Sequence, residues 1–509
     1  MSMPSRSRIF SRGRAARVRA ARLVAWALCA ASLPGCYTLL GSRGGGEVDE
    51  VPAAHGRKVQ PADVALPAGY RIEVVAEGLT FPTAVAFDDA GGVYVTEGGY
   101  SYGEVFTTPR LLRVEPGGKT RVIASGDHPP WTGIDYRDGA FYVAQGGELG
   151  GGRIVRILPD GSIHPMVEDL PSVGDHHTNG ALVGPDGMLY FAVGVATNSG
   201  VVGLDNQGIG WLRRYPQFHD IPCRDVRVLG YNFRTPNPLT PEPDDEAVTG
   251  AFSPFGTRTE AGARIPGQVP CTGAIMRVPL AGGRPELVAW GFRNPYGLAF
   301  SPDGRLYVTE NGFDERGSRH VFGAGDYMYE VKQGLWYGWP DFAGAEPVYT
   351  ERFRPPLHAD PPPRLLADHP NAPPAPVARF GVHSSSNRFD FSRNPAFDHV
   401  GEAFVAQFGD MAPPVGKVCA PVGFEVARVD VRTGVIRSFA ANRGKTRGPA
   451  SWVGSGGLER PVDARFDPSG QSLYVVDFGV LAMTKEASHP VEATGVLWKI
   501  TRDGAGGAK

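Results

Sequence analysis

The chain has 509 residues, and its 51 lysines and arginines nearly balance its 53 aspartates and glutamates, which leaves a formal net charge of −2. This balance excludes the strongly basic surface of a nucleic-acid-binding protein and an acidic tail. The 69 glycines and 46 prolines are typical of a turn-rich, all-β protein.

Residues 1–35 predict an export signal. Seven arginines between Arg6 and Arg22 precede the apolar run LVAWALCAASL, and the segment ends in Leu33-Pro34-Gly35-Cys36. This order is typical of a bacterial lipoprotein signal, so we expect Cys36 to be lipidated and residues 36–65 to form a flexible tether. An ordinary cleaved signal followed by free secretion is the alternative, and the apolar run is too short for a transmembrane helix. In both cases the domain is exported, facing the periplasm or the cell exterior.

One short sequence pattern then occurs six times. It consists of an apolar triplet, a turn built on Asp or Gly, and an aromatic residue flanked by small or β-branched residues. Side chains two residues apart share one face of a strand, so each copy predicts a β-hairpin. The copies run over Ala84–Gly99, Gly133–Gly147, Gly180–Gly194, Gly297–Gly312, Arg388–Gly409 and Asp463–Gly479.

Six hairpins predict an all-β fold, a six-bladed β-propeller over residues 66–505. A single hairpin cannot bury its apolar face alone, whereas blades that pack on their neighbours can. Outer strand pairs are expected to begin at Arg110, Gly152, Ala274 and Phe424. The strand-like segments that start at Tyr70 and Gly495 each lack a neighbouring hairpin, so we expect these N- and C-terminal strands to close one blade.

Residues 200–273 interrupt the repeat with an insertion rich in proline and polar residues. Cys223 and Cys271 bracket much of it, and in an oxidising compartment we expect them to form a disulfide. Cys419 is then left over and is expected to be a buried thiol. No CxxCH motif occurs, so covalently attached haem is not expected.

Polar residues cluster beside the apolar inner strands, where a propeller opens to its axial channel. Solvated loops rarely place so many histidines, arginines and asparagines there, so we expect a site at one mouth of the channel. The densest clusters are GDHHTNGALVGPDG from Gly174, WGFRNPYGLAFSPDG from Trp290, TENGFDERG from Thr309, WYGWPDF from Trp336, HSSSNRFDF from His383 and GGLERPVDARF from Gly456.

These motifs resemble the quinoprotein sugar dehydrogenases, meaning the soluble glucose, aldose sugar and L-sorbosone dehydrogenases that bind pyrroloquinoline quinone (PQQ) on a six-bladed propeller. The resemblance runs from about Leu66 to the C-terminus, and AFVAQFGD near Ala403 is most similar to the sorbosone branch. It implies an oxidoreductase that oxidises a sugar or sugar-derived aldehyde by hydride transfer to PQQ, with an external electron acceptor.

The resemblance also implies roles for individual residues. His177 matches the general base, because neutral imidazole suits proton removal from a hydroxyl, and His176 does not occupy the matching position. Arg293 matches a residue that lies over the cofactor and stabilises charge on the quinone oxygens, and Asn294 matches a neighbour that contacts the quinone. Purely structural roles for this histidine and this arginine are the alternatives.

The implied metal is Ca²⁺, held by the backbone carbonyls of Gly312 and Phe313, because this hard cation readily accepts carbonyl oxygen. Arg460 matches a cofactor-binding arginine of the family. The family's second position of this kind, two residues later, is Val462 in this chain, which has no charge. Lys417 is a candidate substitute for a family lysine that is absent from its usual place.

Aromatic residues near these motifs are candidates for a sugar-stacking platform, and packing inside the propeller is their alternative role. His383, which begins an inner strand, is expected at the same mouth. The candidate substrate-contacting residues are Trp131, Tyr337, Trp339 and His383, with Trp336 beside them.

Two other functions stay open. One is a non-catalytic propeller lipoprotein for binding. The other is a calcium-dependent, lactonase-like hydrolase, which needs several carboxylate or Asn side chains converging on one calcium. The expected partners are a small sugar or aldehyde, an external electron acceptor and the membrane through the lipid anchor, with no nucleic acid.

Overall fold

The computed structural model describes residues 42–49, 57–147, 150–208 and 210–503. The chain divides into two compact units, Met1–Ser42 and Arg43–Lys509, and the propeller belongs to the second. The predicted export signal and Cys36 lie outside the described residues. Of the helices within the described ranges, none has the length and apolar character needed to cross a bilayer.

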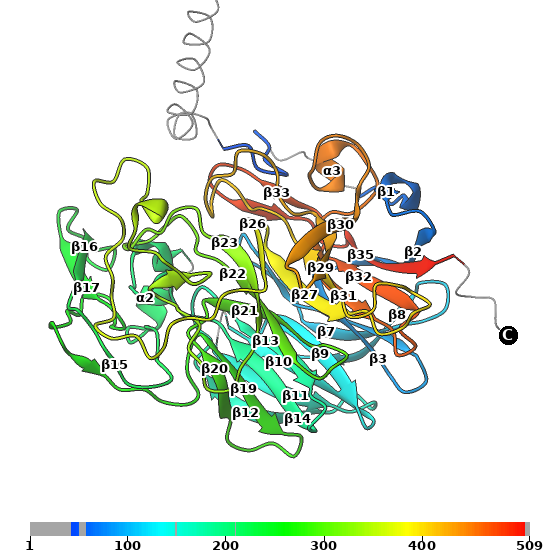
Figure 1. Ribbon diagram of the computed structural model, residues 1–509, viewed down its shortest axis with the longest axis horizontal. Helices are drawn as coiled ribbons and strands as arrows, with labels where there is room; N and C mark the ends of the chain where they lie inside the picture. The colour runs from blue at the N-terminus through cyan, green and yellow to red at the C-terminus, as the bar shows by residue number, and fades with distance from the viewer. Residues whose placement is uncertain (1–41, 50–56, 148–149, 209, 504–509) are drawn as a thin grey trace, which may run out of the picture. The chain divides into compact units, whose positions relative to one another are not determined.

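Six antiparallel sheets form a six-bladed β-propeller, as the repeats predicted (Figure 1). We number the blades by their inner strands. Blade 1 contains β3 (Pro82–Phe87), β4 (Val93–Glu97), β7 (Arg110–Val114) and β8 (Thr120–Ser125). Blade 2 contains β9 (Trp131–Arg137), β10 (Ala140–Gly146), β11 (Gly152–Ile157) and β12 (Ile163–Leu170). Blade 3 contains β13 (Thr178–Val183), β14 (Met188–Val193), β19 (Ala274–Pro279) and β20 (Glu286–Trp290).

The remaining blades complete the ring. Blade 4 contains β21 (Asn294–Phe300), β22 (Leu306–Asn311), β23 (Gly325–Glu330) and β26 (Ala378–Val382). Blade 5 contains β27 (Ser386–Phe391), β28 (Ala403–Gln407), β29 (Glu425–Asp430) and β30 (Val435–Asn442), with β1 (Val64–Ala65) at its outer edge. Blade 6 contains β31 (Pro461–Phe466), β32 (Ser472–Asp477), β35 (Gly495–Arg502) and β2 (Tyr70–Leu79).

Each predicted hairpin supplies the two inner strands of one blade. In blade 4 the turn closes with a hydrogen bond from the Ser301 amide to the Arg305 carbonyl at 2.8 Å, and Gly304 adopts a φ of +80°. A glycine tolerates this left-handed backbone without the steric cost that other residues carry.

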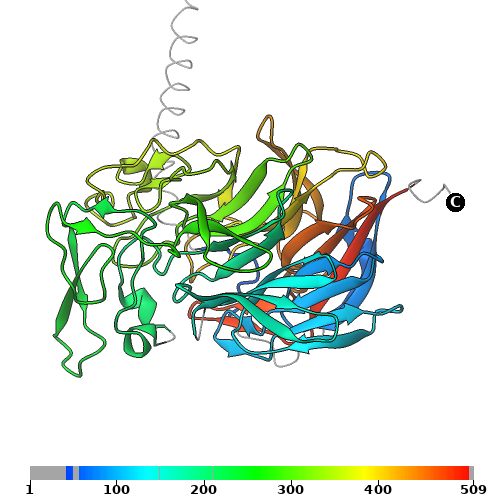
Figure 2. The same ribbon diagram turned by 90° about the horizontal axis from the view of Figure 1, so that it is seen from below.

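The two ends of the array share blade 6, as predicted. Strand β2 pairs with β35 in antiparallel register, from Tyr70 opposite Arg502 to Leu79 opposite Gly495. Figure 2 shows the red C-terminal strand beside the blue N-terminal strands. Main-chain pairing between the first long strand and the last therefore closes the ring.

Buried aspartates join neighbouring inner strands. The carboxylate of Asp135 on β9 accepts the amide of Val183 on β13 at 2.7 Å, and that of Asp463 on β31 accepts the amide of Val85 on β3 at 3.0 Å. Their residues are 6% and 1% exposed. Because an unpaired buried amide would be costly, these bonds help to fix the packing of one blade on the next.

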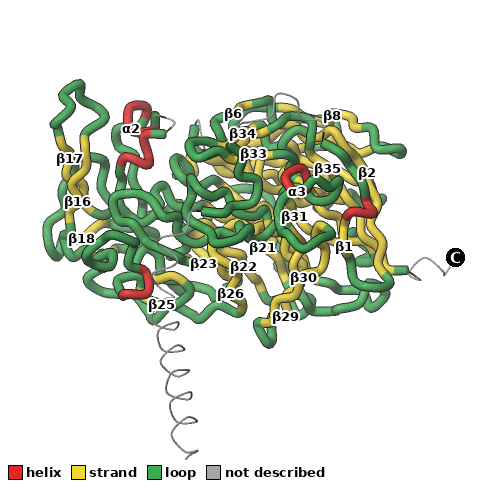
Figure 3. The backbone as a smooth tube through the Cα atoms, turned by 90° about the horizontal axis from the view of Figure 1, so that it is seen from above, coloured by secondary structure: helices red, strands yellow, loops and turns green. Residues whose placement is uncertain are grey.

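The insertion between β14 and β19 is accompanied by a second one, residues 331–377 between β23 and β26, which the sequence did not predict. The two insertions lie side by side, since the Leu229 amide donates to the Leu365 carbonyl at 2.8 Å. Figure 3 shows that loops dominate this side of the unit. The short elements of the two insertions are η2 (Leu204–Gln207), α2 (Trp211–Arg214), β15 (Val226–Arg227), β16 (Asn232–Pro236), β17 (Glu246–Gly250), β18 (Arg264–Ile265), β24 (Phe342–Ala343), β25 (Glu346–Pro347) and η3 (Glu351–Phe353).

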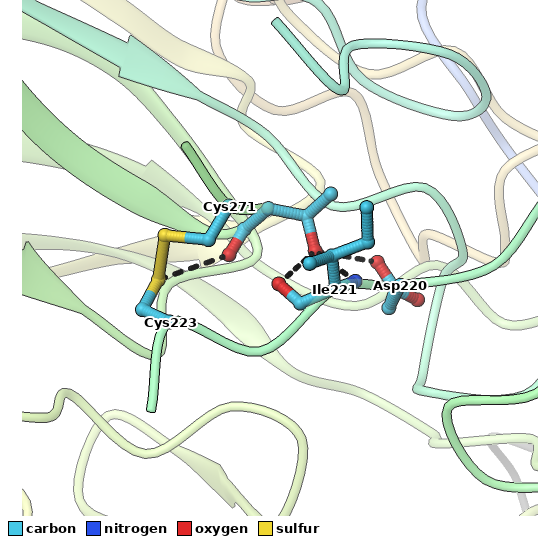
Figure 4. Close-up of a disulfide and its surroundings, with 5 residues drawn as sticks. Asp220, Ile221, Cys223 and Cys271 are labelled. Atoms are coloured by element: carbon cyan, nitrogen blue, oxygen red, sulfur yellow. Dashed lines mark hydrogen bonds between the residues drawn. A yellow bond between two sulfur atoms is a disulfide. The ribbon is translucent and has the colours of Figure 1, made fainter. Parts of the chain in front are cut away.

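Cys223 and Cys271 form the predicted disulfide (Figure 4). Beside it, the Asp220 carboxylate accepts hydrogen bonds from the Thr197 and Thr272 hydroxyls and from the Ala196 amide. The prediction that Cys419 is buried is wrong, because its thiol is exposed. Cys419 lies in an exposed loop before β29, outside the apolar core.

The flexible tether predicted for residues 36–65 is, in its described parts, packed against the propeller. Strand β1 pairs with β30, and η1 (Pro61–Asp63) precedes it. Residues 43–49 run beside β33 (Leu481–Met483), where the Met483 amide donates to the Gly46 carbonyl at 2.9 Å. The remaining short elements are β5 (Tyr100–Ser101), β6 (Val105–Phe106), β34 (Ser488–Pro490) and α3 (Ala450–Val453).

Candidate active site

A cavity of about 350 Å³ lies at the mouth of the propeller where the inner strands begin. Its wall includes His176 before β13, Asn294 at the start of β21, and Ser385 before β27. Pockets for small ligands commonly enclose roughly 300–1,000 Å³, so this cavity can hold a sugar-sized or cofactor-sized molecule. A second depression, of about 820 Å³, lies at the opposite ends of the same strands and is lined largely by hairpin turns.

Arg293 lies in the cavity wall and is 3% exposed. Its guanidinium donates to Asn198 Oδ1 at 3.0 Å, to the Gly312 carbonyl at 2.6 Å and to Asp314 Oδ2 at 2.8 Å. These bonds hold the positive charge at the cavity. They also tie blade 4 to the loop that follows β22, so Arg293 has the structural role that the sequence left open.

A second arginine, Arg316, joins three carboxylates around the cavity. It donates to Asp205 at 2.8 Å, to Asp175 at 2.8 Å and to Asp314 at 3.0 Å. Burial alone would raise the pKa of Asp314, but Arg293 and Arg316 outweigh burial and hold its pKa well below the usual value. Burial raises the pKa of Asp205 to about 6 despite its contact with Arg316.

The histidine in the wall is His176, whereas His177 does not line the cavity. The His177 ring packs edge-on against Tyr100, with ring centroids 5.7 Å apart. The His176 ring is buried, and burial together with the nearby Arg293 lowers its pKa well below the usual value. The catalytic role predicted for His177 therefore stays a prediction, and the geometry brings its neighbour to the cavity instead.

His383 lies in the wall as predicted and is 8% exposed. Its Nε2 is 3.7 Å from a Glu315 oxygen, and Glu315 itself accepts the Lys417 amide at 3.0 Å. Burial would lower the pKa of His383, but the Glu315 and Asp314 carboxylates outweigh burial and raise it. The raised pKa favours the protonated form of His383 in the wall.

Arg460 lies outside the cavity wall and is fully buried. Its guanidinium sits between the Phe408 and Phe424 rings, at 5.0 and 5.1 Å from their centroids, and donates to the Asp410 carbonyl at 3.0 Å. The Gly45 carbonyl accepts from it at 3.4 Å. The N-terminal segment thus covers the arginine that the resemblance assigned to the cofactor.

The four aromatic residues predicted to form a sugar-stacking platform are buried and lie outside the cavity wall. Trp131, Trp336 and Tyr337 are 0%, 0% and 3% exposed, and none of them lines the cavity. Trp339 is also buried, and its indole donates to the Asn198 carbonyl at 3.3 Å. Burial of these large rings in the blades and the second insertion outweighs any role at the channel. The aromatic residues that do line the cavity are Tyr100, Tyr102 and Trp211.

The metal was predicted at the backbone carbonyls of Gly312 and Phe313. Gly312 lies in the cavity wall, and its carbonyl accepts a hydrogen bond from Arg293. Among the residues that the structure describes, no group of three or more His, Cys, Asp and Glu side chains is arranged to hold a metal ion. Calcium binding stays a prediction.

The wall fits an anionic cofactor in part. Arg293, Asn294 and Gly312 gather at one place, as a quinone would need. The wall also carries five carboxylates, however, against two arginines; these carboxylates are Glu104, Asp175, Asp205, Asp314 and Asp326. A tricarboxylate such as PQQ would be repelled by this excess unless a cation entered with it.

Sequence reasoning missed the contributions of the first insertion and of the hairpin β5–β6 to the cavity wall. Asp205 and Trp211 come from the insertion after β14, and Tyr100 and Tyr102 come from the short hairpin β5–β6 between β4 and β7. Neither segment shows the hairpin pattern, and the order of residues does not reveal that both reach the same mouth. The GD dipeptide before His176 belongs to the polar cluster that begins at Gly174, and this cluster is the available signal for Asp175.

Comparisons with known proteins agree with the predicted resemblance. Residues 265–357 match the family model described as Glucose / Sorbosone dehydrogenase, a segment that contains Arg293, Gly312 and Arg316. Quinoprotein glucose dehydrogenase B of Acinetobacter calcoaceticus is 24% identical over 183 residues, which cover 35% of this chain and 29% of that protein. The chain is therefore similar to the quinoprotein glucose dehydrogenases, and these matches do not distinguish the sorbosone branch.

A solved structure shares the fold. The holo PQQ domain of pyranose dehydrogenase from Coprinopsis cinerea is 14% identical, with 89% of this chain and all of that chain covered at a TM-score of 0.50, and at this identity the likeness concerns the propeller fold alone. The PQQ-bound aldose sugar dehydrogenase of Streptomyces coelicolor also matches, at 17% identity, with 86% of this chain and 99% of that chain covered at a TM-score of 0.46.

Proposed function

We propose that this protein is a PQQ-dependent dehydrogenase that oxidises a sugar or a sugar-derived aldehyde. The observation that carries the proposal is the axial cavity in which His176, Arg293 and Asn294 meet, inside a propeller whose sequence matches a glucose and sorbosone dehydrogenase model. The motif AFVAQFGD supports a substrate of the sorbosone type within that class.

The residues of the cavity support an oxidation in which a hydroxyl group loses a hydride and a proton. His176 is neutral near pH 7, and its Nδ1 donates to the Val195 carbonyl at 2.9 Å, so Nε2 carries the lone pair that can take the proton. Arg293, held by Asn198 and Asp314, places a fixed positive charge where negative charge develops. PQQ, when bound, would accept the hydride.

Residues at the cavity could hold the cofactor at one end. Arg293 and Asn294 would lie against the quinone, and the Gly312 carbonyl would bind Ca²⁺ if Arg293 released it. Arg460 could contribute only if residues 43–49 moved away from it. The lipid anchor at Cys36 and export belong to the same proposal and depend on the N-terminal sequence signal alone, and the external electron acceptor depends on the family resemblance.

The test is to add PQQ and Ca²⁺ to the purified protein and to follow dye reduction with aldoses, sorbosone and polyols. Calcium- and quinone-dependent reduction of the dye is expected with at least one of these substrates. Tight quinone binding without dye reduction would point to a substrate outside the panel, and failure to bind PQQ would overturn the proposal.

A second function, a sugar-binding propeller without the cofactor, is favoured by one observation. The carboxylates outnumber the arginines in the wall, and Arg460 is sealed from it. Such a wall suits a neutral, hydroxylated ligand better than a tricarboxylate. Sugar binding in the absence of PQQ binding would identify this function.

A further inference from the structure

Two segments that interrupt the blade pattern supply the aromatic residues of the cavity wall. The hairpin β5–β6 carries Tyr102, and the start of the first insertion carries Trp211 on α2. Neither segment is needed to complete a four-stranded blade, because blades 1 and 3 each have four strands without them. Their common location at the cavity therefore calls for an explanation other than blade packing.

Tyr102 is unusually exposed for a residue in a cavity wall. It is 39% exposed, and its ring packs edge-on against Phe408 and Tyr100, at centroid distances of 6.2 and 6.0 Å. A large aromatic ring left open to a cavity offers a flat apolar face, the surface that stacks on the C–H face of a sugar ring.

Trp211 is fixed in position by its own insertion. It is 8% exposed, and its ring stacks on Phe218 with centroids 5.9 Å apart and planes 25° apart. Within the described part of the chain its Nε1 atom is buried and has no hydrogen-bond partner. Buried indole N–H groups normally find an acceptor, so this donor lacks one that a ligand could provide.

Asp205 complements this donor. One of its oxygens, Oδ2, is held by Arg316 at 2.8 Å, while the other, Oδ1, is buried and without a hydrogen-bond partner in the described residues. The side chain of Asp205 is 9% exposed. The same short segment of the insertion thus presents an unsatisfied donor, Trp211 Nε1, and an unsatisfied acceptor, Asp205 Oδ1. A hydroxyl group can both accept and donate a hydrogen bond, so the hydroxyl groups of a ligand suit both atoms.

We propose that Tyr102, Trp211 and Asp205 form the sugar-recognition subsite: Tyr102 stacks on the ring of a polyhydroxylated substrate, and Trp211 and Asp205 bind its hydroxyl groups. This inference rests on the proposed function only for the class of substrate, not for the cofactor. It gives the first insertion a role in substrate selection, since Asp205 and Trp211 belong to it. Arg316 and Phe218 act as positioning residues for the two contacts.

Binding, rather than turnover, tests the subsite. Isothermal titration calorimetry of the full purified protein, without added cofactor, would use D-glucose, sorbitol and propan-1-ol as probes. The two polyhydroxylated probes should bind and propan-1-ol should not. Tyr102→Ala should weaken the binding of D-glucose by about 3- to 12-fold, as expected for the loss of one aromatic contact. Trp211→Phe, which keeps the ring and removes the N–H, should weaken it by roughly 3- to 10-fold.

Matched controls exist for both variants. Phe106 is also 39% exposed and lies on the same hairpin, but it does not line the cavity, so Phe106→Ala should leave binding unchanged. Trp452 lies on α3 and donates its indole N–H to the Glu47 carbonyl, so Trp452→Phe should also leave binding unchanged. Thermal melts of each variant verify that the fold is intact.

Three results would overturn the subsite: wild-type affinity in both Tyr102→Ala and Trp211→Phe, an equal loss in the two controls, or no binding of either polyhydroxylated probe to the wild-type protein. If the sugar binds and the variants weaken it while dye reduction fails, the subsite stands and the dehydrogenase proposal falls. If the loaded protein is active, the same two variants should raise KM and leave kcat within about twofold.

Discussion

The Nδ1 atom of His176 lies 2.9 Å from the carbonyl oxygen of Val195. A carbonyl only accepts hydrogen bonds, so the ring proton resides on Nδ1 and the lone pair on Nε2. Burial and the nearby Arg293 lower the pKa of this imidazole and keep it neutral near pH 7. A neutral histidine with a fixed tautomer in a cavity wall is suited to general-base catalysis.

We therefore expect His176→Ala to lower kcat for dye reduction by about 10²- to 10⁴-fold, the usual contribution of a general base. His177→Ala should lower kcat by less than tenfold, because His177 packs against Tyr100 and does not line the cavity. Steady-state kinetics on the PQQ- and calcium-loaded protein measure both. A larger loss in His177→Ala than in His176→Ala would restore the assignment made from the sequence motif.

Asp220 should make stability depend on pH. Burial raises the pKa of Asp220 to about 7, above the value near 4 of an unfolded aspartate. The folded protein then holds this proton more tightly than the unfolded chain. The contribution to stability is thus greatest below about pH 4, declines as the pH rises toward about 7, and is constant above that.

Asp220→Asn should flatten this decline. The Asn oxygen can still accept the Ala196 amide, and its NH₂ group can donate to the Thr197 hydroxyl, which can rotate to accept. Thermal unfolding at intervals from pH 4 to pH 8 would compare the two proteins. Parallel curves for wild type and variant would show that Asp220 does not titrate in this window.

Loss of the disulfide should loosen the first insertion. Cys223 and Cys271 close a loop with a sequence separation of 48 residues. Replacing both with serine should lower the free energy of unfolding by about 2–4 kcal/mol. Cys419→Ser is the matched control, because that thiol is exposed and free, and it should leave stability unchanged. Denaturant titration would compare the wild type, the double serine variant and Cys419→Ser. Equal unfolding midpoints for the wild type and the double serine variant would contradict the prediction.

The N-terminal segment should tolerate no side chain at Gly45. A Cβ atom there would collide with the Phe424 ring, and the Gly45 amide donates to both Asp410 oxygens at 3.0 and 3.2 Å. Gly45→Val should therefore destabilise this segment by about 1–3 kcal/mol, as overpacking does. Gly150→Ala is the control, since its Cβ would meet only His128 atoms at 3.9 Å. Limited proteolysis would detect release of residues 43–49, and equal cleavage in wild type and Gly45→Val would refute the prediction.

The blades could be predicted because the residues that form a hairpin are close together in the sequence. The alternation of side chains and the turn glycines of Gly297–Gly312 need no information from elsewhere in the chain. Residues 331–377 carry no such pattern, and their packing on the first insertion joins Leu229 to Leu365 across a long stretch of sequence. Local signals do not encode that contact.

The site was predicted in part for the same reason. Arg293, Asn294, Gly312 and His383 line the cavity because they flank the starts or ends of inner strands, and their roles stay predictions. Adjacent residues in extended chain point to opposite sides, so a shift of one position separates His176 from His177. The burial of Arg460 depends on Gly45, 415 residues earlier in the chain, and no motif around Arg460 contains that partner.

The pairing of β2 with β35 bears on how this protein is made. Strand β35 (Gly495–Arg502), which lies between β32 and the outer strand β2 in blade 6, is among the last segments to leave the ribosome, so the circle closes late in synthesis. Contacts this distant in sequence form slowly. If the proposed export signal is used, this late closure leaves the chain incompletely folded during its synthesis, the state that a translocation machinery can thread.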